Sequence, residues 1–347
     1  MRYGPIGDNL AERAFLRSGM APVAMIDGYS PAFGRAVVVA TETGIFDALA
    51  DGPQAADSVA TACDLNPRAT RKLLDLLVAM RYLKVNDGAY RLRRHVRRWL
   101  LADRPGSVRD AVLMKRLEWR WIEGFDTFIR DGHGLEIHER MTPEDWKVYQ
   151  RGMRAHGNLL GPLFGRAIPV PIGARSMLDI GGSAGHYSVA VCRRHPDLRA
   201  TVLDLPAAVE QAAPILAKEG MGDRVVLRAG DALTDDLGSS AYDLILISGL
   251  VHHFDDAANR TLVEKSARAL RAGGALVICD LLRPEDPGKA DQMGAFIDLF
   301  LALSNESGMW TAGEMAAWQR AAGLAVRKPI RLRLAPGFGL QVADKTG

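Results

Sequence analysis

The feature that most constrains the fold is an alternation of apolar and helical segments over the second half of the chain. Short and nearly continuous apolar runs, including "SMLDIGG", "ATVLDLP" and "YDLILISGL", follow one another from Ser176 onward, with helical patterns between them. Strands that are apolar on both faces and separated by helices form parallel sheets covered on both sides. We therefore predict an α/β domain with a Rossmann-like sheet, and "AVRKPIRLRL" and "FGLQVAD" predict a strand hairpin at its end.

The first third of the chain has a different, mostly helical pattern. "ADSVATACDL" and "ATRKLLDLLVAM" predict two short helices, the second with its apolar residues on one face. "RYLKVNDGAYRL" then predicts two strands around the turn signal Asp87-Gly88. Helix, helix and hairpin follow in the order of a winged helix. We predict three regions: a winged-helix domain at 1–107, a helical connector contributing to a substrate cleft at 108–170, and the α/β domain at 171–347.

A winged helix raises the question of DNA binding. The second helix carries Arg68, Arg71 and Lys72, and the basic run "RLRRHVRR" follows the predicted wing. However, the net charge of the chain is only +3, and a short basic run is usually a solvated surface. Fold alone does not establish function. We therefore predict no nucleic-acid partner, while a winged-helix regulator stays open as an alternative.

The cysteines and the N-terminus bear on the compartment. Cys63, Cys192 and Cys279 are an odd set without CxxC spacing, which is typical of a reducing compartment and argues against disulfides and a cysteine metal site. The N-terminus has no apolar signal-peptide segment, and no apolar run reaches the ~20 residues of a membrane span. We predict a cytoplasmic protein with no membrane partner and no metal.

The strongest signal for a ligand site is "LDIGGSAGHYS". Asp179 ends the first strand, and Gly181 and Gly182 begin a turn in which the backbone can approach a ligand. No register of this loop has the glycine spacing of a nicotinamide dinucleotide fingerprint. Asp204 ends the second strand, where a carboxylate can accept from ribose hydroxyls, and Asp231 follows the third, where it can accept from an adenine amino group. Because nothing resembles a phosphate cradle, this pattern favours S-adenosylmethionine (SAM) over NAD or ATP.

These motifs carry a resemblance to a known family. From about Phe33 to the C-terminus the chain resembles the SAM-dependent small-molecule O-methyltransferases, which methylate plant phenolics of the caffeate and acetylserotonin type and bacterial polyketides and pigments. The resemblance rests on "TGIFDALADGP", "RKLLDLLVAMRYL", "LDIGGSAG", "VLDLP", "GDAL" and "RAGGALVICD". It implies a class I methyltransferase sheet, an N-terminal winged-helix domain that forms a homodimer, a small-molecule substrate, and conversion of SAM to S-adenosylhomocysteine.

The resemblance also implies a set of cofactor-binding residues. By position they are Asp179, Gly181, Gly182, Asp204, Leu205, Gly230, Asp231, Ala232 and Ser248. The chain departs from the family pattern at three places. Ser183 stands where a third glycine is usual, Ala232 replaces a larger apolar residue, and Ser248 replaces a lysine common in the plant enzymes. We expect SAM binding to survive these changes.

The segment "SGLVHHFDD" contains the candidate base. The family motif here reads like "LHDWSDE", and its histidine, which removes the proton of the substrate hydroxyl, matches His252, while His253 matches the aspartate. A phenol with a pKa near ~10 needs a base within hydrogen-bond reach, and imidazole serves near neutral pH. Of the two acids that flank the family histidine, Asp280 matches the first, whereas the second falls on Met309. A purely structural role for His252, or His253 as base, stays open.

Three candidate substrate residues come from the resemblance. Leu301 and Asn305 match positions that line the family's substrate pocket, and Met153 matches a methionine near the reacting centre. Phe296 is a candidate because the apolar residues of "MGAFIDLFLALSNESG" mostly repeat at helical spacing, although core packing is an alternative for this helix. We predict an O-methyltransferase acting on a hydroxyl of an aromatic or polyketide-like small molecule. The alternatives are an N- or C-methyl acceptor, a SAM-binding homologue that catalyses another reaction, and a SAM-sensing regulator.

Overall fold

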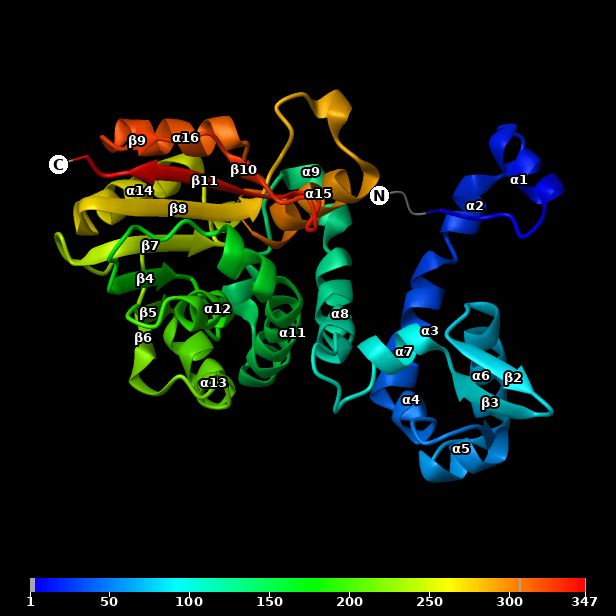
Figure 1. The fold of residues 1–347 in the computed structure, drawn as a ribbon. Helices are drawn as coiled ribbons and strands as arrows, with labels where there is room; N and C mark the ends of the chain where they lie inside the picture. The colour runs from blue at the N-terminus through cyan, green and yellow to red at the C-terminus, as the bar shows by residue number, and fades with distance from the viewer. Residues whose placement is uncertain (1–3, 306, 347) are drawn as a thin grey trace. The chain divides into compact units, whose positions relative to one another are not determined.

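The computed structural model describes residues 4–305 and 307–346, and it divides into two compact units. The first is Met1–Arg116 and the second is Leu117–Gly347. Both units are shown in Figure 1, and each is described by itself below.

The first unit is helical with one small sheet. Its elements are α1 (Leu10–Arg17), α2 (Val23–Asp27), α3 (Ser30–Glu42), α4 (Ile45–Ala48), β1 (Gln54–Ala55), α5 (Ala56–Ala62), α6 (Pro67–Ala79), β2 (Leu83–Asn86), β3 (Ala89–Leu92) and α7 (Arg94–Trp99), and α8 (Arg109–Ile122) runs across its end. Strands β2 and β3 pair antiparallel around Asp87 and Gly88, which both have positive φ. The predicted succession of two helices and a hairpin is therefore present, with β1 added to the free edge of β3.

Helix α6 shows why this region folds as predicted. The Asn66 side chain accepts a hydrogen bond from the Ala69 N–H at 3.0 Å, and Pro67 occupies the first turn, where its missing N–H costs nothing. Leu74 and Leu77 are fully buried in a core that also contains Phe46. Burial of this apolar face stabilises a helix that is short for independent stability.

The second unit is an α/β domain. Its helices are α9 (Phe125–Asp131), α10 (Ile137–Arg140), α11 (Pro143–Ala167), α12 (His186–Arg194), α13 (Pro206–Ala217), α14 (Asp256–Ala269), α15 (Gln292–Ser304) and α16 (Ala312–Ala321). Its strands are β4 (Ser176–Ile180), β5 (Arg199–Asp204), β6 (Val225–Ala229), β7 (Tyr242–Ser248), β8 (Leu270–Leu281), β9 (Ala325–Val326), β10 (Ile330–Arg331) and β11 (Phe338–Asp344). A short 3₁₀ turn, η2 (Val251–His253), follows β7.

The sheet of this unit has the strand order β10-β11-β8-β7-β4-β5-β6 (Figure 1). Neighbouring strands from β6 through β8 are parallel, whereas β11 runs antiparallel between β8 and β10. The predicted Rossmann-like sheet and terminal hairpin are confirmed. Strand β8 begins at Leu270, earlier than "GGALVICDLL" predicts.

Two apolar cores cover the two faces of this sheet. In β7, Leu244 and Leu246 belong to the core that includes Phe164 of α11, while Ile245 and Ile247 belong to the core that includes Trp318 of α16. Because successive side chains of a strand point to opposite faces, a strand buried on both sides must be apolar throughout. This explains the continuous apolar runs of the sequence.

The described residues give two further findings. None of their helices is both long enough and apolar enough to cross a bilayer. Within 4–305 and 307–346, no group of three or more His, Cys, Asp or Glu side chains is arranged to hold a metal ion.

Candidate active site

The predicted cofactor residues gather at one edge of the sheet. Asp204 pairs in register with Ala229, immediately before the Gly230–Ala232 turn, and Ile180 lies between Leu203 and Ile247. Because the carboxyl ends of parallel strands meet at one edge, the loops after β4, β5, β6 and β7 are neighbours. This edge is where open α/β sheets bind ligands.

The loop after β4 has no room for side chains at its glycines. Gly181 has a φ of 68°, and a Cβ there would lie 2.8 Å from a methyl carbon of Leu250. A Cβ on Gly182 would lie 2.6 Å from the Asp179 Cγ. Glycine is therefore required at both positions, and Leu250 brings the segment before η2 into contact with this loop.

Ser183, the departure from the family's third glycine, is accommodated by two partners. Its φ is 53°, a left-handed conformation that a non-glycine residue adopts at a cost. Its backbone N–H donates to the Asp204 Oδ2 at 2.7 Å, and its hydroxyl donates to the side-chain oxygen of Gln150 on α11. Both Gln150 and Ser183 are buried, so the extra hydroxyl is satisfied. The sequence analysis did not identify Gln150, because no motif contains it.

Asp179 is a fully buried acid with one unsatisfied oxygen. Its Oδ2 accepts from the Ser188 hydroxyl at 2.6 Å, whereas its Oδ1 has no hydrogen-bond partner among the described residues. Burial raises the pKa of Asp179 to about 7, and the nearby Asp204 adds to the rise. A buried carboxyl oxygen without a donor is costly unless a donor reaches it.

Asp204 is held by backbone donors. Its Oδ1 accepts from the Leu205 N–H at 2.8 Å, and its Oδ2 accepts from Ser183. Burial raises its pKa, and the two backbone hydrogen bonds act in the opposite direction. Each carboxylate oxygen can accept two hydrogen bonds, so one position on each oxygen stays available to a ligand.

The remaining predicted cofactor residues lie on the next two loops. Asp231 accepts from the Leu233 N–H at 2.9 Å, and the Ala232 carbonyl accepts from the Lys265 ammonium at 2.8 Å. The Gly230 N–H donates to the Asp204 carbonyl at 3.0 Å. Ser248 ends β7 and is buried.

The partly buried His252 forms a hydrogen-bonded pair with the buried Asp280. The His252 Nδ1 lies 3.0 Å from both oxygens of Asp280, and Asp280 is 2% exposed. An ionised carboxylate only accepts, so Nδ1 carries the proton of the imidazole and the lone pair lies on Nε2. The Leu281 N–H donates to the Asp280 Oδ1 at 2.8 Å and fixes that carboxyl group. The pair has the geometry of an oriented general base.

The backbone of η2 is clamped from two sides. The Val251 carbonyl accepts from the Trp310 indole N–H and from the Asn259 amide, both at 2.9 Å. The His252 carbonyl accepts from the Gly308 N–H at 3.2 Å. These contacts place the segment after α15 directly against the candidate base.

Met309 occupies the position that the resemblance assigns to the family's second acid. Met309 is buried, and its backbone N–H donates to the Asp298 carboxylate at 2.7 Å. Glu306, which is near this position in the sequence but out of register, lies outside the described residues. Among the described residues, Asp280 is the acid hydrogen-bonded to His252.

His253 lies beside His252 and contacts different partners. Its Nδ1 is hydrogen-bonded to the Asn305 side-chain oxygen. Its ring centre lies 4.3 Å from that of His252 and 4.7 Å from that of His138. Burial and the neighbouring histidines lower the pKa of His253 well below its usual value, and burial lowers that of His138 to about 4. His138 was missed by the sequence analysis because no motif contains it.

Aromatic rings surround this cluster. The His138 ring centre lies 5.3 Å from that of Trp146 and 5.4 Å from that of Tyr149, both on α11. Trp121 lies 6.5 Å from Tyr149 and 6.2 Å from Phe300 of α15. Connector residues therefore meet α15 next to the histidines.

The four predicted substrate residues lie on α11 and at α15. Phe296 is 44% exposed and stacks with the next aromatic ring of α15 at 6.1 Å. Leu301 is partly buried, and its carbonyl accepts from the Asn305 amide at 3.0 Å. Asn305 is buried with its oxygen toward His253, and Met153 is partly buried one helical turn after Tyr149.

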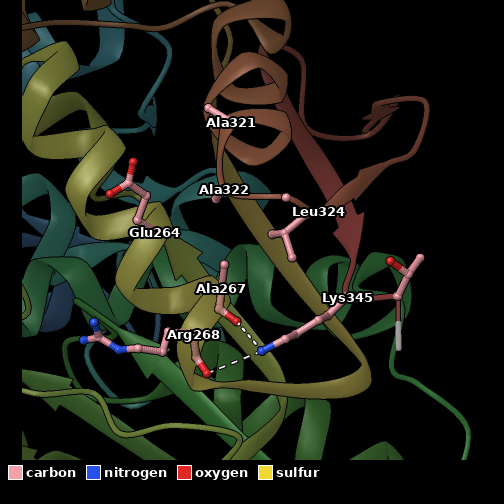
Figure 2. A pocket seen from close by; sticks show the side chains of 9 residues that line it. Glu264, Ala267, Arg268, Ala321, Ala322, Leu324 and Lys345 are labelled. Carbon is pink, nitrogen blue, oxygen red and sulfur yellow. Dashed lines mark hydrogen bonds between the residues drawn. The ribbon is translucent and has the colours of Figure 1, made fainter.

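A surface pocket of about 380 Å³ lies elsewhere, between the ends of α14 and α16 (Figure 2). None of the predicted site residues lines it. Lys345 points to its floor and donates to the carbonyls of Ala267 at 2.9 Å and Leu270 at 2.7 Å. Its ammonium thereby satisfies carbonyls at the end of α14. These hydrogen bonds give Lys345 a structural role at this pocket.

Comparison with known proteins identifies two domains. The O-methyltransferase domain family matches residues 109–325, and the O-methyltransferase dimerisation domain matches residues 28–102. The chain is 28% identical to the 3-hydroxy-5-methyl-1-naphthoate 3-O-methyltransferase of Streptomyces sahachiroi over 89% of this chain and 90% of that protein. It is 29% identical to the N,N-dimethyltransferase OxyT of Streptomyces rimosus over 90% and 92%.

The fold is also found in solved structures. Human N-acetylserotonin methyltransferase, solved in complex with SAM, matches with a TM-score of 0.82 at 19% identity. The match covers 99% of this chain and 100% of that one. This likeness supports the class I methyltransferase fold.

Proposed function

The chain belongs to the O-methyltransferase family, a family of SAM-dependent enzymes, and from this premise we propose that it methylates a hydroxyl of an aromatic or polyketide-like small molecule with His252 as general base. The observation that carries the proposal is the hydrogen-bonded pair of His252 and the buried Asp280. His252 lies two residues after Leu250, which contacts the glycine loop. A base and a candidate cofactor loop are thus adjacent on the same sheet edge.

The residues at this edge fit SAM. The Asp179 Oδ1 has no hydrogen-bond donor among the described residues, and Asp204 keeps one accepting position on each oxygen. Gly181 and Gly182 carry no side chains that would cover the backbone of the loop. We assign Asp204 to the ribose hydroxyls and Asp231 to the adenine amino group. We assign the other binding contacts to Asp179, Gly181, Gly182, Leu205, Gly230, Ala232 and Ser248. When bound, SAM supplies an electrophilic methyl group on a sulfonium.

The protein's own residues supply the base and its orientation. With the Nδ1–H of His252 donated to Asp280, the Nε2 lone pair accepts the proton of the substrate hydroxyl. The Asp280 carboxylate then stabilises the imidazolium that forms, as a buried charge partner does in a low-dielectric site. The clamp on the Val251 carbonyl keeps the ring in place, and holding the reactants in line contributes further.

The acceptor class follows from the rings around the base. Trp146 and Tyr149 lie against His138, and Trp121 and Phe300 extend this group of rings. Flat aromatic ligands pack well against aromatic faces. We place Phe296 and Met153 in the same wall as outer contacts. The naphthoate O-methyltransferase relative is named for an aromatic acceptor, whereas the dimethyltransferase relative is named as an N-methylating enzyme. An aromatic amine is therefore the competing acceptor class.

We propose that the active form is a homodimer joined through the N-terminal region. The dimerisation domain supports this arrangement. The N-terminal segment also exposes a series of large apolar side chains: Ile6, Leu10, Phe15, Met20, Met25, Tyr29 and Phe33. Exposed apolar surface on this scale marks an interaction site in a protein otherwise built with a buried core.

The test is formation of S-adenosylhomocysteine. The protein is incubated with SAM and a pool of phenolic, enolic and aromatic-amine compounds, and the product is measured by mass spectrometry. Wild type, His252→Ala and the exposed-histidine control His133→Ala run side by side. We expect turnover in wild type and control, reduced by two orders of magnitude or more in His252→Ala, because general bases contribute roughly 10²–10⁴-fold.

Two outcomes would contradict this proposal. Equal turnover in wild type and His252→Ala would make the histidine structural and leave proximity as the source of rate. SAM binding without formation of S-adenosylhomocysteine from any compound would favour a homologue that uses SAM for another reaction. The presence of Met309 at the position of the family's second acid supports that alternative.

A further inference from the structure

His253, the histidine that replaces an aspartate of the family motif, is held in one tautomer. The Asn305 Nδ2 donates to the Leu301 carbonyl at 3.0 Å and to the Ser304 hydroxyl at 2.9 Å. Both amide hydrogens are thereby used, and a flipped amide would set its oxygen against the Leu301 carbonyl. The Asn305 oxygen must then face His253, so the His253 Nδ1 carries the hydrogen.

The other nitrogen of His253 is consequently a bare acceptor. The described residues offer no hydrogen bond to Nε2, and the ring is only partly buried. Burial and the adjacent His138 and His252 oppose protonation of the ring and lower its pKa well below the usual value. At neutral pH His253 therefore presents a lone pair and no donor on its Nε2 side.

The ring that carries this lone pair lies beside the ring of the candidate base. The ring centres of His252 and His253 are 4.3 Å apart, and both side chains come from the same 3₁₀ turn. With Nδ1–H donated to Asp280, His252 also carries its lone pair on Nε2. Two neighbouring acceptors match two neighbouring hydrogen-bond donors on one ligand.

From this juxtaposition, and resting on the proposed function, we propose that the acceptor carries a second hydroxyl or N–H beside the reacting hydroxyl, and that His253 binds it through Nε2. An imidazole lone pair accepts a hydrogen but repels an ether or carbonyl oxygen. His253 is thus a specificity-determining residue and Asn305 is its positioning residue. It follows that the enzyme acts before the neighbouring hydroxyl has been methylated by any other transferase.

Binding of matched naphthols tests the specificity. Affinities of 2,3-dihydroxynaphthalene, 2-naphthol and 3-methoxy-2-naphthol are measured by calorimetry on the full chain with S-adenosylhomocysteine present. We expect the diol to bind about three- to tenfold more tightly than 2-naphthol, the range of one net hydrogen bond, and the methyl ether to bind most weakly. His253→Phe should bring the three affinities together. Equal affinities in wild type, or an unchanged order in His253→Phe, overturn the inference.

A spectroscopic measurement tests the tautomer without any ligand. Two-bond ¹H–¹⁵N spectra of protein labelled at histidine should show His253 protonated at Nδ1 at pH 7. Asn305→Leu should shift it toward the Nε2–H form, and Asn305→Asp, which keeps an accepting oxygen, should restore the Nδ1–H form. An Nε2–H tautomer in wild type overturns the inference.

The same compounds separate this inference from the proposed function. Binding in the expected order, with no S-adenosylhomocysteine formed from SAM and any of the three compounds, would refute methyl transfer to such hydroxyls and leave the role of His253 supported. Methyl transfer without preference for the diol would support the function and overturn the role of His253. No binding of any compound would overturn both the naphthol-like acceptor class and the inference.

Discussion

Replacing Asp280 with asparagine removes the charge that orients the candidate base while keeping the volume of the side chain. The carboxylate lies 3.0 Å from the His252 Nδ1 through both oxygens and is 2% exposed, so water screens this interaction little. A hydrogen bond to a charged group contributes about 1.5–3 kcal/mol. At 1.36 kcal/mol for each factor of ten, Asp280→Asn should lower kcat by roughly 10- to 150-fold.

The asparagine also offers the imidazole an N–H in place of one carboxylate oxygen. That contact favours the tautomer with the hydrogen on Nε2, in which no lone pair faces the substrate. The assay is kcat at several pH values, with the dissociation constant of SAM as a second readout that should change little. Asp280→Glu, which keeps the charge and adds one methylene, should retain more activity than Asp280→Asn. A loss below threefold in Asp280→Asn would refute the assignment of Asp280 as the orienting acid.

Three further predictions concern the cofactor loop, stability and assembly. Because the pKa of Asp179 is raised to about 7, the folded state binds the proton of this carboxyl group more tightly than the unfolded state does. The group therefore lowers the free energy of unfolding by up to about 4 kcal/mol as pH rises from about 4 to about 7. Urea unfolding of ligand-free Asp179→Asn should lack this decline, and an equal dependence of stability on pH in both proteins would contradict the prediction. Gly182→Ala should weaken SAM binding and cost about 1–3 kcal/mol, since its Cβ would lie 2.6 Å from the Asp179 Cγ, whereas Gly52→Ala, which meets nothing within 4 Å, is the matched control. Phe15→Glu with Met25→Glu should yield monomers by light scattering at micromolar concentration, and an intact dimer would exclude this surface as the interface.

The architecture was predictable because its causes are local in the sequence. Strands such as "YDLILIS" are buried on both faces, so their apolar runs are continuous and the helices between them are forced to cover the sheet. Asp87 and Gly88 supply the two positive φ angles of the wing turn. The acids at strand ends could be expected at one edge, since parallel topology brings those ends together. Their roles toward SAM stay predictions.

The details around the candidate base were not predictable, because they depend on side chains from distant segments. Gln150 reaches Ser183 across 33 residues of chain, and neither position signals the other in the sequence. His138 carries no motif, and it joins the histidine cluster only when α10 packs beside η2. In the sequence, Asn305 was one of several residues assigned to a pocket wall.

The sequence by itself determined the fold class, the winged-helix order, the family and the positions from which a cofactor site would be built. These features depend on periodicity, glycine turns and acids at strand ends, which are local patterns in the sequence. Tertiary structure alone decided which oxygen of Asp179 lacks a donor and which nitrogen of His253 has no hydrogen. Those properties arise from hydrogen-bond partners and burial, and both are set only when segments far apart in the chain pack together.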